Sequence, residues 1–150
     1  MPIICSFFGH REISQNIEPE LYTEIERHIT EKNVDTFYTG GYGAFDFMTE
    51  KILNDIKKQF PHISVYRILA YVPAVTDMKN NQKQPLTIYP EGLELVPKRF
   101  AITYRNRWMV EWSDYIIGYT ANNYGGAYDA LKYAGHNKKI ITNLTSLCIF

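Results

Sequence analysis

Several features that would assign this sequence of 150 residues to a specialised class are missing from it. Sixteen basic residues balance sixteen acidic ones, so no overall charge draws the chain onto nucleic acid or an anionic membrane. No apolar run approaches the roughly 18 residues that a membrane helix needs, and no basic region with a long apolar stretch opens the chain. We therefore expect a cytoplasmic protein without membrane or nucleic-acid partners. Any ligand should be bound through the shape of a local site and not through the overall charge.

Cysteine is scarce as well. Cys5 and Cys148 are the two in the sequence, and no CxxC or similar spacing suggests a disulfide framework or a metal site. His28, His62 and His136 are expected on helix surfaces or ends, without the spacing of metal ligands. The sequence thus predicts no bound metal and no cofactor.

What the chain does have is an ordinary globular composition, with 45% apolar and 21% charged residues. Its length fits a single domain spanning residues 1–150. Tyrosine, with twelve residues, is the one type that is unusually abundant in this composition. Because tyrosine joins an apolar ring to a polar tip, this abundance suits a ligand pocket or a subunit interface as well as a core.

Apolar runs of strand length alternate with stretches of helical periodicity. This order indicates an α/β, Rossmann-like three-layer domain with a parallel sheet of about five strands and right-handed crossovers. Residues 74–100 carry a polar run between prolines and are expected to form a flap with little internal structure. Strands are expected at 3–8, 34–38, 64–72, 114–119 and 139–142, and helices at 17–29, 45–60, 103–112 and 127–134.

Two glycine-rich turns each follow a strand and precede a helix. Without side chains, such turns let backbone N–H groups and the positive helix end approach an anion, at the sheet edge where parallel sheets bind ligands. The alternative is that the glycines only make tight turns, since the spacing matches neither the dinucleotide fingerprint nor a P-loop. Candidate ligand-binding residues are Thr39, Gly40, Gly41, Tyr42, Gly43 and Asp46 in the first turn, and Asn122, Asn123, Gly125 and Gly126 in the second.

A third candidate group, Gly9-His10-Arg11, ends the first expected strand at the same edge. It offers an imidazole that titrates near neutral pH and a guanidinium suited to phosphate. The structural alternative is that His10 caps backbone groups while Arg11 pairs with an acid such as Asp46.

The helix expected at 103–112 carries Arg105, Arg107 and Glu111. An exposed ion pair between Arg107 and Glu111 is the structural explanation for those two residues. The nearby Trp108 and Trp112 are expected in the core more than on a platform for stacking bases.

These motifs, in this order, resemble the SLOG superfamily, which includes the DprA/Smf proteins, the LOG phosphoribohydrolases and YpsA-like proteins. Gly9-His10-Arg11 is similar to the opening GHR of the YpsA-like branch, and residues 39–46 resemble its GGAxGxD loop. Residues 105–109 with Ser113-Asp114 are similar to the RKxxM…AD motif of LOG proteins, which places Arg105 on their catalytic arginine. The second turn lacks the proline and glutamate of the LOG motif PGGxGTxxE, and Asp129 is its nearest carboxylate.

The resemblance implies a module that binds a nucleotide-type small molecule, either a nucleoside phosphate or an NAD-derived or cyclic nucleotide signal, and that senses or sequesters it. The alternative is an enzyme, a nucleoside 5′-monophosphate phosphoribohydrolase that uses Arg105 with Asp129 or Asp46. Family precedent also implies a homo-oligomer, a dimer or larger. On this basis a Gly41→Asp variant is expected to remain folded and lose nucleotide binding.

Overall fold

The computed structural model describes residues 1–13, 16–72 and 85–145. None of the helices in these ranges is long and apolar enough to cross a membrane. In chain order the elements are β1 (Ile4–Gly9), α1 (Glu18–Thr30), β2 (Thr36–Thr39), α2 (Ala44–Lys57), β3 (Ser64–Ile68), β4 (Leu86–Ile88), the 3-10 turns η1 (Leu93–Leu95) and η2 (Lys98–Phe100), α4 (Ala101–Trp112), β5 (Tyr115–Tyr119), α5 (Gly126–His136) and β6 (Ile140–Asn143).

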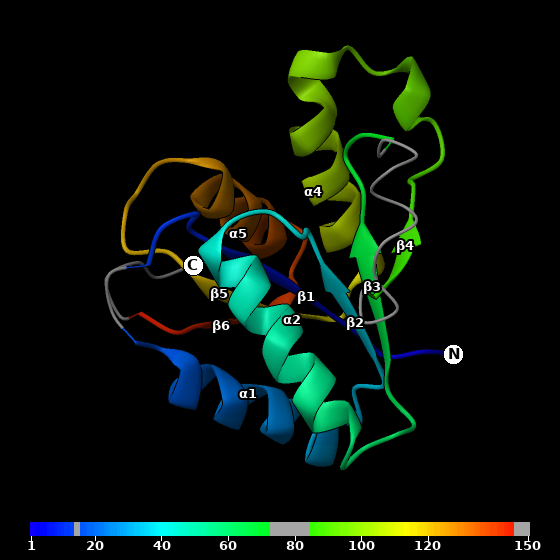
Figure 1. The fold of residues 1–150 in the computed structure, drawn as a ribbon. Helices are drawn as coiled ribbons and strands as arrows, with labels where there is room; N and C mark the ends of the chain where they lie inside the picture. Colours follow the sequence, from blue (N-terminus) through cyan, green and yellow to red (C-terminus); the bar gives the residue numbers. More distant parts are fainter. Residues whose placement is uncertain (14–15, 73–84, 146–150) are drawn as a thin grey trace.

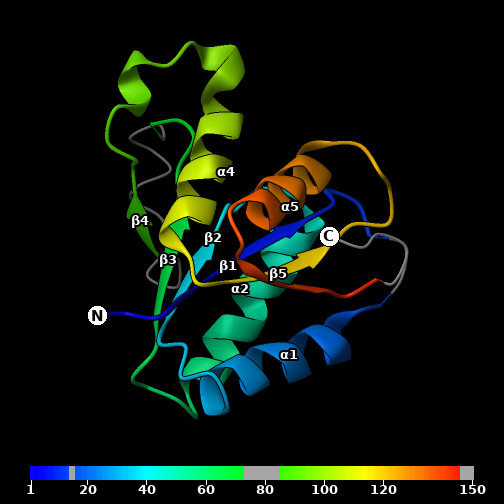
Figure 2. The ribbon, with the colours of Figure 1, turned by 180° about the vertical axis from the view of Figure 1, so that it is seen from behind.

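The strands form one parallel sheet of six strands in the order β4-β3-β2-β1-β5-β6. Helices α1 and α2 cover one face, and α4 and α5 cover the other (Figures 1 and 2). The Rossmann-like, three-layer α/β prediction is confirmed, with six strands in place of about five. The chain runs outward from β1 to β4 and then returns to lay β5 beside β1, so the strand order reverses between β1 and β5.

The additional strand, β4, lies in the segment predicted to be an unstructured flap. Leu86–Ile88 pairs with β3, and η1 and η2 follow it before α4 begins at Ala101. This strand lies between Pro85 and Pro90, and its three residues are too few to show an alternating pattern. Only the pairing with β3 therefore reveals it. Positions 74–84 of the expected flap lie outside the described residues.

The central strand β1 explains how the two helical layers share one sheet. Successive side chains of a strand point to opposite faces, and accordingly Cys5 and Phe7 join the core under α1 and α2, while Ile4 and Phe8 join the core under α4 and α5. A run of this kind reads as nearly continuous apolar sequence because both faces are covered. This arrangement fixes the end of β1, at Gly9, in the middle of the sheet edge.

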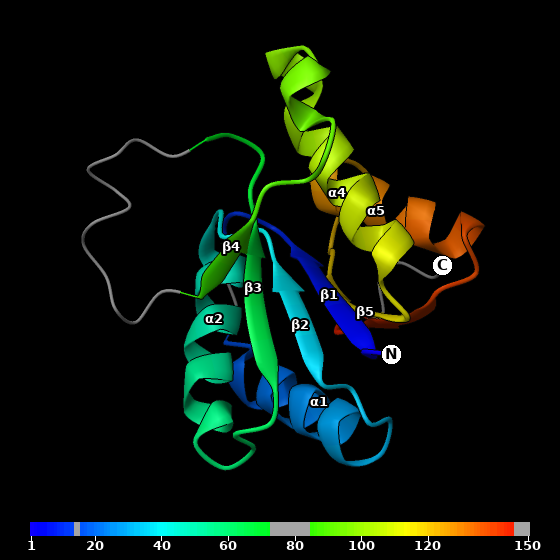
Figure 3. The same cartoon turned by 90° about the vertical axis from the view of Figure 1, so that its right-hand side faces the viewer.

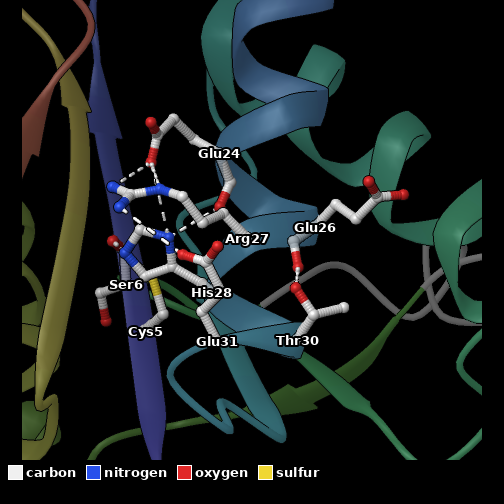
Figure 4. A network of polar contacts seen from close by, with 8 residues as sticks. All are labelled: Cys5, Ser6, Glu24, Glu26, Arg27, His28, Thr30 and Glu31. Atoms are coloured by element: carbon white, nitrogen blue, oxygen red, sulfur yellow. Dashed lines mark hydrogen bonds and ion pairs between the residues drawn. The ribbon is translucent and has the colours of Figure 1, made fainter.

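His28 does not lie on a helix surface as predicted, because its ring is fully buried. It points from α1 toward β1, where Cys5 lies (Figure 4), and it packs edge-on against the ring of Tyr115. Nδ1 lies 2.7 Å from the carbonyl oxygen of Glu24, whereas Nε2 is buried without a hydrogen-bond partner among the described residues. His62 and His136 are exposed, as expected.

His28 should make the fold sensitive to mild acid. Burial lowers the pKa of this ring, an effect that Lys32 and Arg27 reinforce and Glu24 opposes. The unfolded chain therefore takes up a proton below about pH 6.5 that the folded chain resists, so stability falls as the pH falls. We expect His28→Leu to lose less unfolding free energy than the wild type between about pH 7.5 and pH 5.5, as measured by denaturant titration at each pH.

His62→Leu is the matched control, because His62 is exposed, and its pH dependence should follow that of the wild type. Equal pH dependence in His28→Leu and wild type would show that the buried ring does not determine acid sensitivity.

Candidate functional site

A cavity of about 280 Å³ opens where the strand order reverses, at the carboxyl edge of the sheet. This is the position at which parallel α/β sheets bind ligands. In Figure 3 the first turns of α4 extend past this edge. Ile102, Arg105, Asn106 and Met109 of this helix line the cavity. The polar part of its lining comes from four separate segments: Gly9, His10 and Arg11; Gly40, Tyr42 and Asp46; Arg105 and Asn106; and Gly126 and Ala127.

The first glycine turn is held tightly against the protein. Gly41 and Gly43 have positive φ angles of 67° and 98°, a region that favours glycine. A Cβ on Gly41 would lie 2.4 Å from the side chain of Arg67, and one on Gly43 would lie 2.7 Å from the backbone of Arg11. Gly41→Asp would therefore strain the fold, and the expectation that this variant stays folded is not supported.

Three backbone donors of this first turn form hydrogen bonds within the protein. The N–H of Ala44 donates to the carbonyl of Arg11 at 2.8 Å, and that of Phe45 donates to the carbonyl of His10. The N–H of Tyr42 donates to Oδ2 of Asp46 at 2.9 Å. The turn thus joins the loop after β1 to the start of α2 and positions Asp46.

Arg105 is buried beside this turn. Its Nη1 donates to the carbonyl of Gly40 at 3.0 Å and to the carbonyl of Ile68 at 3.1 Å, and its Nε donates to Asn106. Since a guanidinium has five N–H donors, the Nη2 group remains without a partner among the described residues. Arg105 therefore joins α4 to the ends of β2 and β3 and keeps one amino group available in the cavity that it lines.

Asp46 is the buried carboxyl group that lines the same cavity. Burial raises the pKa of Asp46 to about 7, against the lowering effects of the Tyr42 N–H and of Arg105. A carboxyl group that titrates near neutral pH can either donate or accept a proton there.

A second buried network supports the turn from below. Arg67 on β3 forms a salt bridge with Glu50 on α2, and Nε of Arg67 lies 3.0 Å from Oε2 of Glu50. The hydroxyl of Thr39 donates to the same Oε2 atom at 2.7 Å. Thr39 therefore positions the turn from beneath and does not line the cavity. Gly41 rests directly on the Arg67 side chain.

His10 ties the loop after β1 to the loop after β5. Its Nε2 accepts the N–H of Ala121 at 2.8 Å, and its ring meets that of Tyr119 edge-on. With Nε2 as acceptor, the neutral ring carries its proton on Nδ1, and burial lowers the pKa of His10. His10 thus caps a backbone group, as its structural alternative proposed, and also lines the cavity.

Arg11 does not pair with Asp46. Its guanidinium lies 4.4 Å from the centre of the Tyr42 ring, a cation–π contact. Both residues line the cavity from its open side.

The second glycine turn differs from the first because open space surrounds its glycines. Gly125 precedes α5 with a φ of 98° and no side-chain cap. A Cβ placed on Gly125 or Gly126 would meet no atom within 4 Å. The N–H groups of Gly126 and Ala127 form no hydrogen bond within the described part of the chain. This helix end therefore presents open donors beside the cavity.

The remaining predicted residues lie around this site. Asn122 lines a neighbouring hollow with His10 and Arg11, and Asn123 is exposed. Asp129 is also exposed and lines a separate groove between α4 and α5. The structure thus places Asp46, and not Asp129, in the same cavity as Arg105.

Comparisons with known proteins relate this arrangement to a known fold. No protein-family model and no curated protein matches the sequence. DNA processing protein A (DprA) from Streptococcus pneumoniae superposes with a TM-score of 0.67 over 95% of this chain at 14% identity. The structure of TM1055 superposes with a TM-score of 0.58 over 93% at 13% identity.

The chain shares the fold of these two proteins. It spans 50% of the length of DprA and 72% of that of TM1055. The predicted resemblance to SLOG proteins is therefore confirmed for the fold, and the closer likeness to the YpsA-like branch stays a prediction.

Sequence reasoning missed two residues that support the first turn of the candidate site, Glu50 and Arg67. Glu50 lies one helical turn after Asp46, on the same face of α2, and Arg67 is the one charge within the apolar run 64–72. A lone charge in a buried strand and an acid on a buried helix face are expected to be paired. That signal could have predicted their salt bridge.

Replacing Asp46 should reveal the cost of its burial. Because its folded pKa is raised from the usual value to about 7, the carboxyl group destabilises the fold increasingly as the pH rises from about 4 to 7. We expect Asp46→Asn, which can still accept the Tyr42 N–H, to be more stable than the wild type at about pH 8.5. The gain should reach at most about 4 kcal/mol, at about 1.4 kcal/mol per pKa unit, in urea unfolding.

The difference should vanish below about pH 4, where both side chains are neutral. Asp55→Asn, at an exposed carboxyl on the same helix, is the control and should change little. A less stable Asp46→Asn protein at alkaline pH would mean that the attraction between the Asp46 carboxylate and Arg105 outweighs the cost of burial.

Proposed function

We propose that this chain binds a nucleotide-type small molecule in the cavity at the carboxyl edge of its sheet, as a sensor or sequestering module. The observation that carries the proposal is the open first turn of α5. Gly126 is a helical glycine, and a Cβ built on it would meet no other described part of the chain within 4 Å, although alanine would favour the helix there. Space that the protein itself does not use, beside unpaired N–H groups and a positive helix end, suits a phosphate group.

The rest of the cavity suits the other parts of such a ligand. Arg105 offers its free Nη2 group, and His10 offers the proton on Nδ1. Tyr42 and Tyr124 are 53% and 68% exposed, so their rings are accessible for stacking on a base. The zero net charge of the chain favours a small ligand held by shape over a nucleic acid held by charge.

Ligand-induced stabilisation tests this function. A nucleotide at 100 times its dissociation constant should raise the unfolding free energy by about 2.7 kcal/mol, which a thermal-shift screen of nucleoside phosphates, NAD derivatives and cyclic nucleotides detects. Gly126→Ala should keep or raise the melting temperature of the free protein, because alanine favours a helix. The same variant should lose most of the shift, because the methyl group enters the phosphate space.

Gly135→Ala changes the other end of the same helix and serves as the control that should retain the shift. A full shift in a folded Gly126→Ala protein would place the phosphate elsewhere.

A second candidate, cleavage of nucleoside 5′-monophosphates, is favoured by one observation. Asp46 has a pKa of about 7 and lies in the cavity that Arg105 lines. Cleavage of an N-glycosidic bond needs an acid or nucleophile beside that bond, and Asp46 meets this need better than the exposed Asp129.

Under this alternative, AMP incubated with the protein should release adenine, as followed by chromatography. Asp46→Asn should slow the release by about 10²–10⁴, the usual contribution of a general acid or base. Asp129→Asn should leave the rate nearly unchanged. Tight AMP binding without any release of adenine would eliminate the enzyme and leave the binding module.

A further inference from the structure

The nucleotide cavity continues into a second hollow. A groove of about 300 Å³ runs between α4 and α5, and Ile102, Asn106 and Gly126 line both it and the first cavity. Ligand pockets for small molecules usually measure about 300–1,000 Å³. Each hollow alone lies at the bottom of this range, whereas a ligand that occupied both would be larger than a single nucleoside monophosphate.

Gly126 is the residue at which the two hollows meet on the α5 side. Its missing side chain leaves free space on the path between them, and its N–H group has no partner in the described residues. A phosphate bound at the first turn of α5 would therefore stand at the entrance to the groove.

Positive side chains line the groove beyond this point. Arg107 from α4 and Lys132 from α5 supply these charges, and His136 and one carboxylate, Asp129, also line the groove. Neither Arg107 nor Lys132 forms an ion pair with the described residues.

The pair expected between Arg107 and Glu111 is replaced by contacts through Tyr133. The guanidinium of Arg107 lies over the Tyr133 ring at 4.9 Å, and the hydroxyl of Tyr133 donates to Glu111 at 2.6 Å. Arg107 is thereby held against the groove wall while its charge stays unpaired. A guanidinium held in this way is suited to a phosphate.

We propose that the ligand is a nucleoside diphosphate ester. This inference rests on the proposed nucleotide-binding function and extends it. The first phosphate binds at the N-terminus of α5, the second passes Gly126 and binds Arg107 and Lys132, and the group esterified to it fills the rest of the α4–α5 groove.

Calorimetric titration of the full chain with AMP and with ADP-ribose tests the inference. The wild type should bind ADP-ribose at least about tenfold more tightly than AMP, the gain expected from one charge-assisted phosphate contact. The double variant Arg107→Gln/Lys132→Gln should lose this preference and bind AMP as the wild type does. The double variant Lys58→Gln/Arg99→Gln removes the same charge at exposed positions outside the groove and should keep the preference.

The outcomes separate this inference from the function on which it rests. Equal affinity for the two ligands, weaker binding of ADP-ribose, or a preference that survives in Arg107→Gln/Lys132→Gln would overturn the diphosphate proposal while leaving nucleotide binding in place. Failure of the folded wild type to bind either ligand would overturn the proposed function itself. If the double variant melts early, each single variant should still lose part of the preference.

Discussion

The buried guanidinium of Arg105 is the contact on which the candidate site depends. Its Nη1 group joins the carbonyls of Gly40 and Ile68, at the ends of two neighbouring strands, to a helix that follows them in sequence by more than thirty residues. In a parallel sheet the last carbonyls of the strands point out of the hydrogen-bonded ladder and need donors. By supplying one, Arg105 positions α4 against the sheet edge and forms a wall of the cavity.

The two glycine turns have different roles because the residues around them differ. In the first, glycines are needed for close packing, since Gly41 rests on Arg67 and Gly43 on the backbone of Arg11. The N–H group of Tyr42 in that turn donates to Asp46, a carboxyl group that lines the cavity. In the second, Gly126 has free space around it and open donors. A site with a proton-exchanging group at one end and an anion-binding helix at the other follows from this contrast.

Much of the fold was accessible from the pattern of residues. Continuous apolar runs such as Ile3–Phe8 mark strands covered on both faces, and the four-residue recurrence of Leu21, Ile25 and Ile29 marks a helix. These signals are local and strong, so the element order and the parallel sheet followed. The strand Leu86–Ile88 was missed because three residues carry no period, and His28 was misplaced because a polar ring on an otherwise apolar helix face gives no sign of whether it is buried.

The sequence by itself determined the order of strands and helices and the positions of the glycine turns, because both depend on the preferences of neighbouring residues. It also placed Gly9, His10, Gly40 and Gly126 at one sheet edge, since every parallel strand ends there. Only the tertiary structure decided which backbone donors remain open, which carboxyl group shares the cavity with Arg105, and that the cavity continues between α4 and α5. Those features depend on which distant segments pack together and take up each other's hydrogen bonds, and no local pattern encodes that choice.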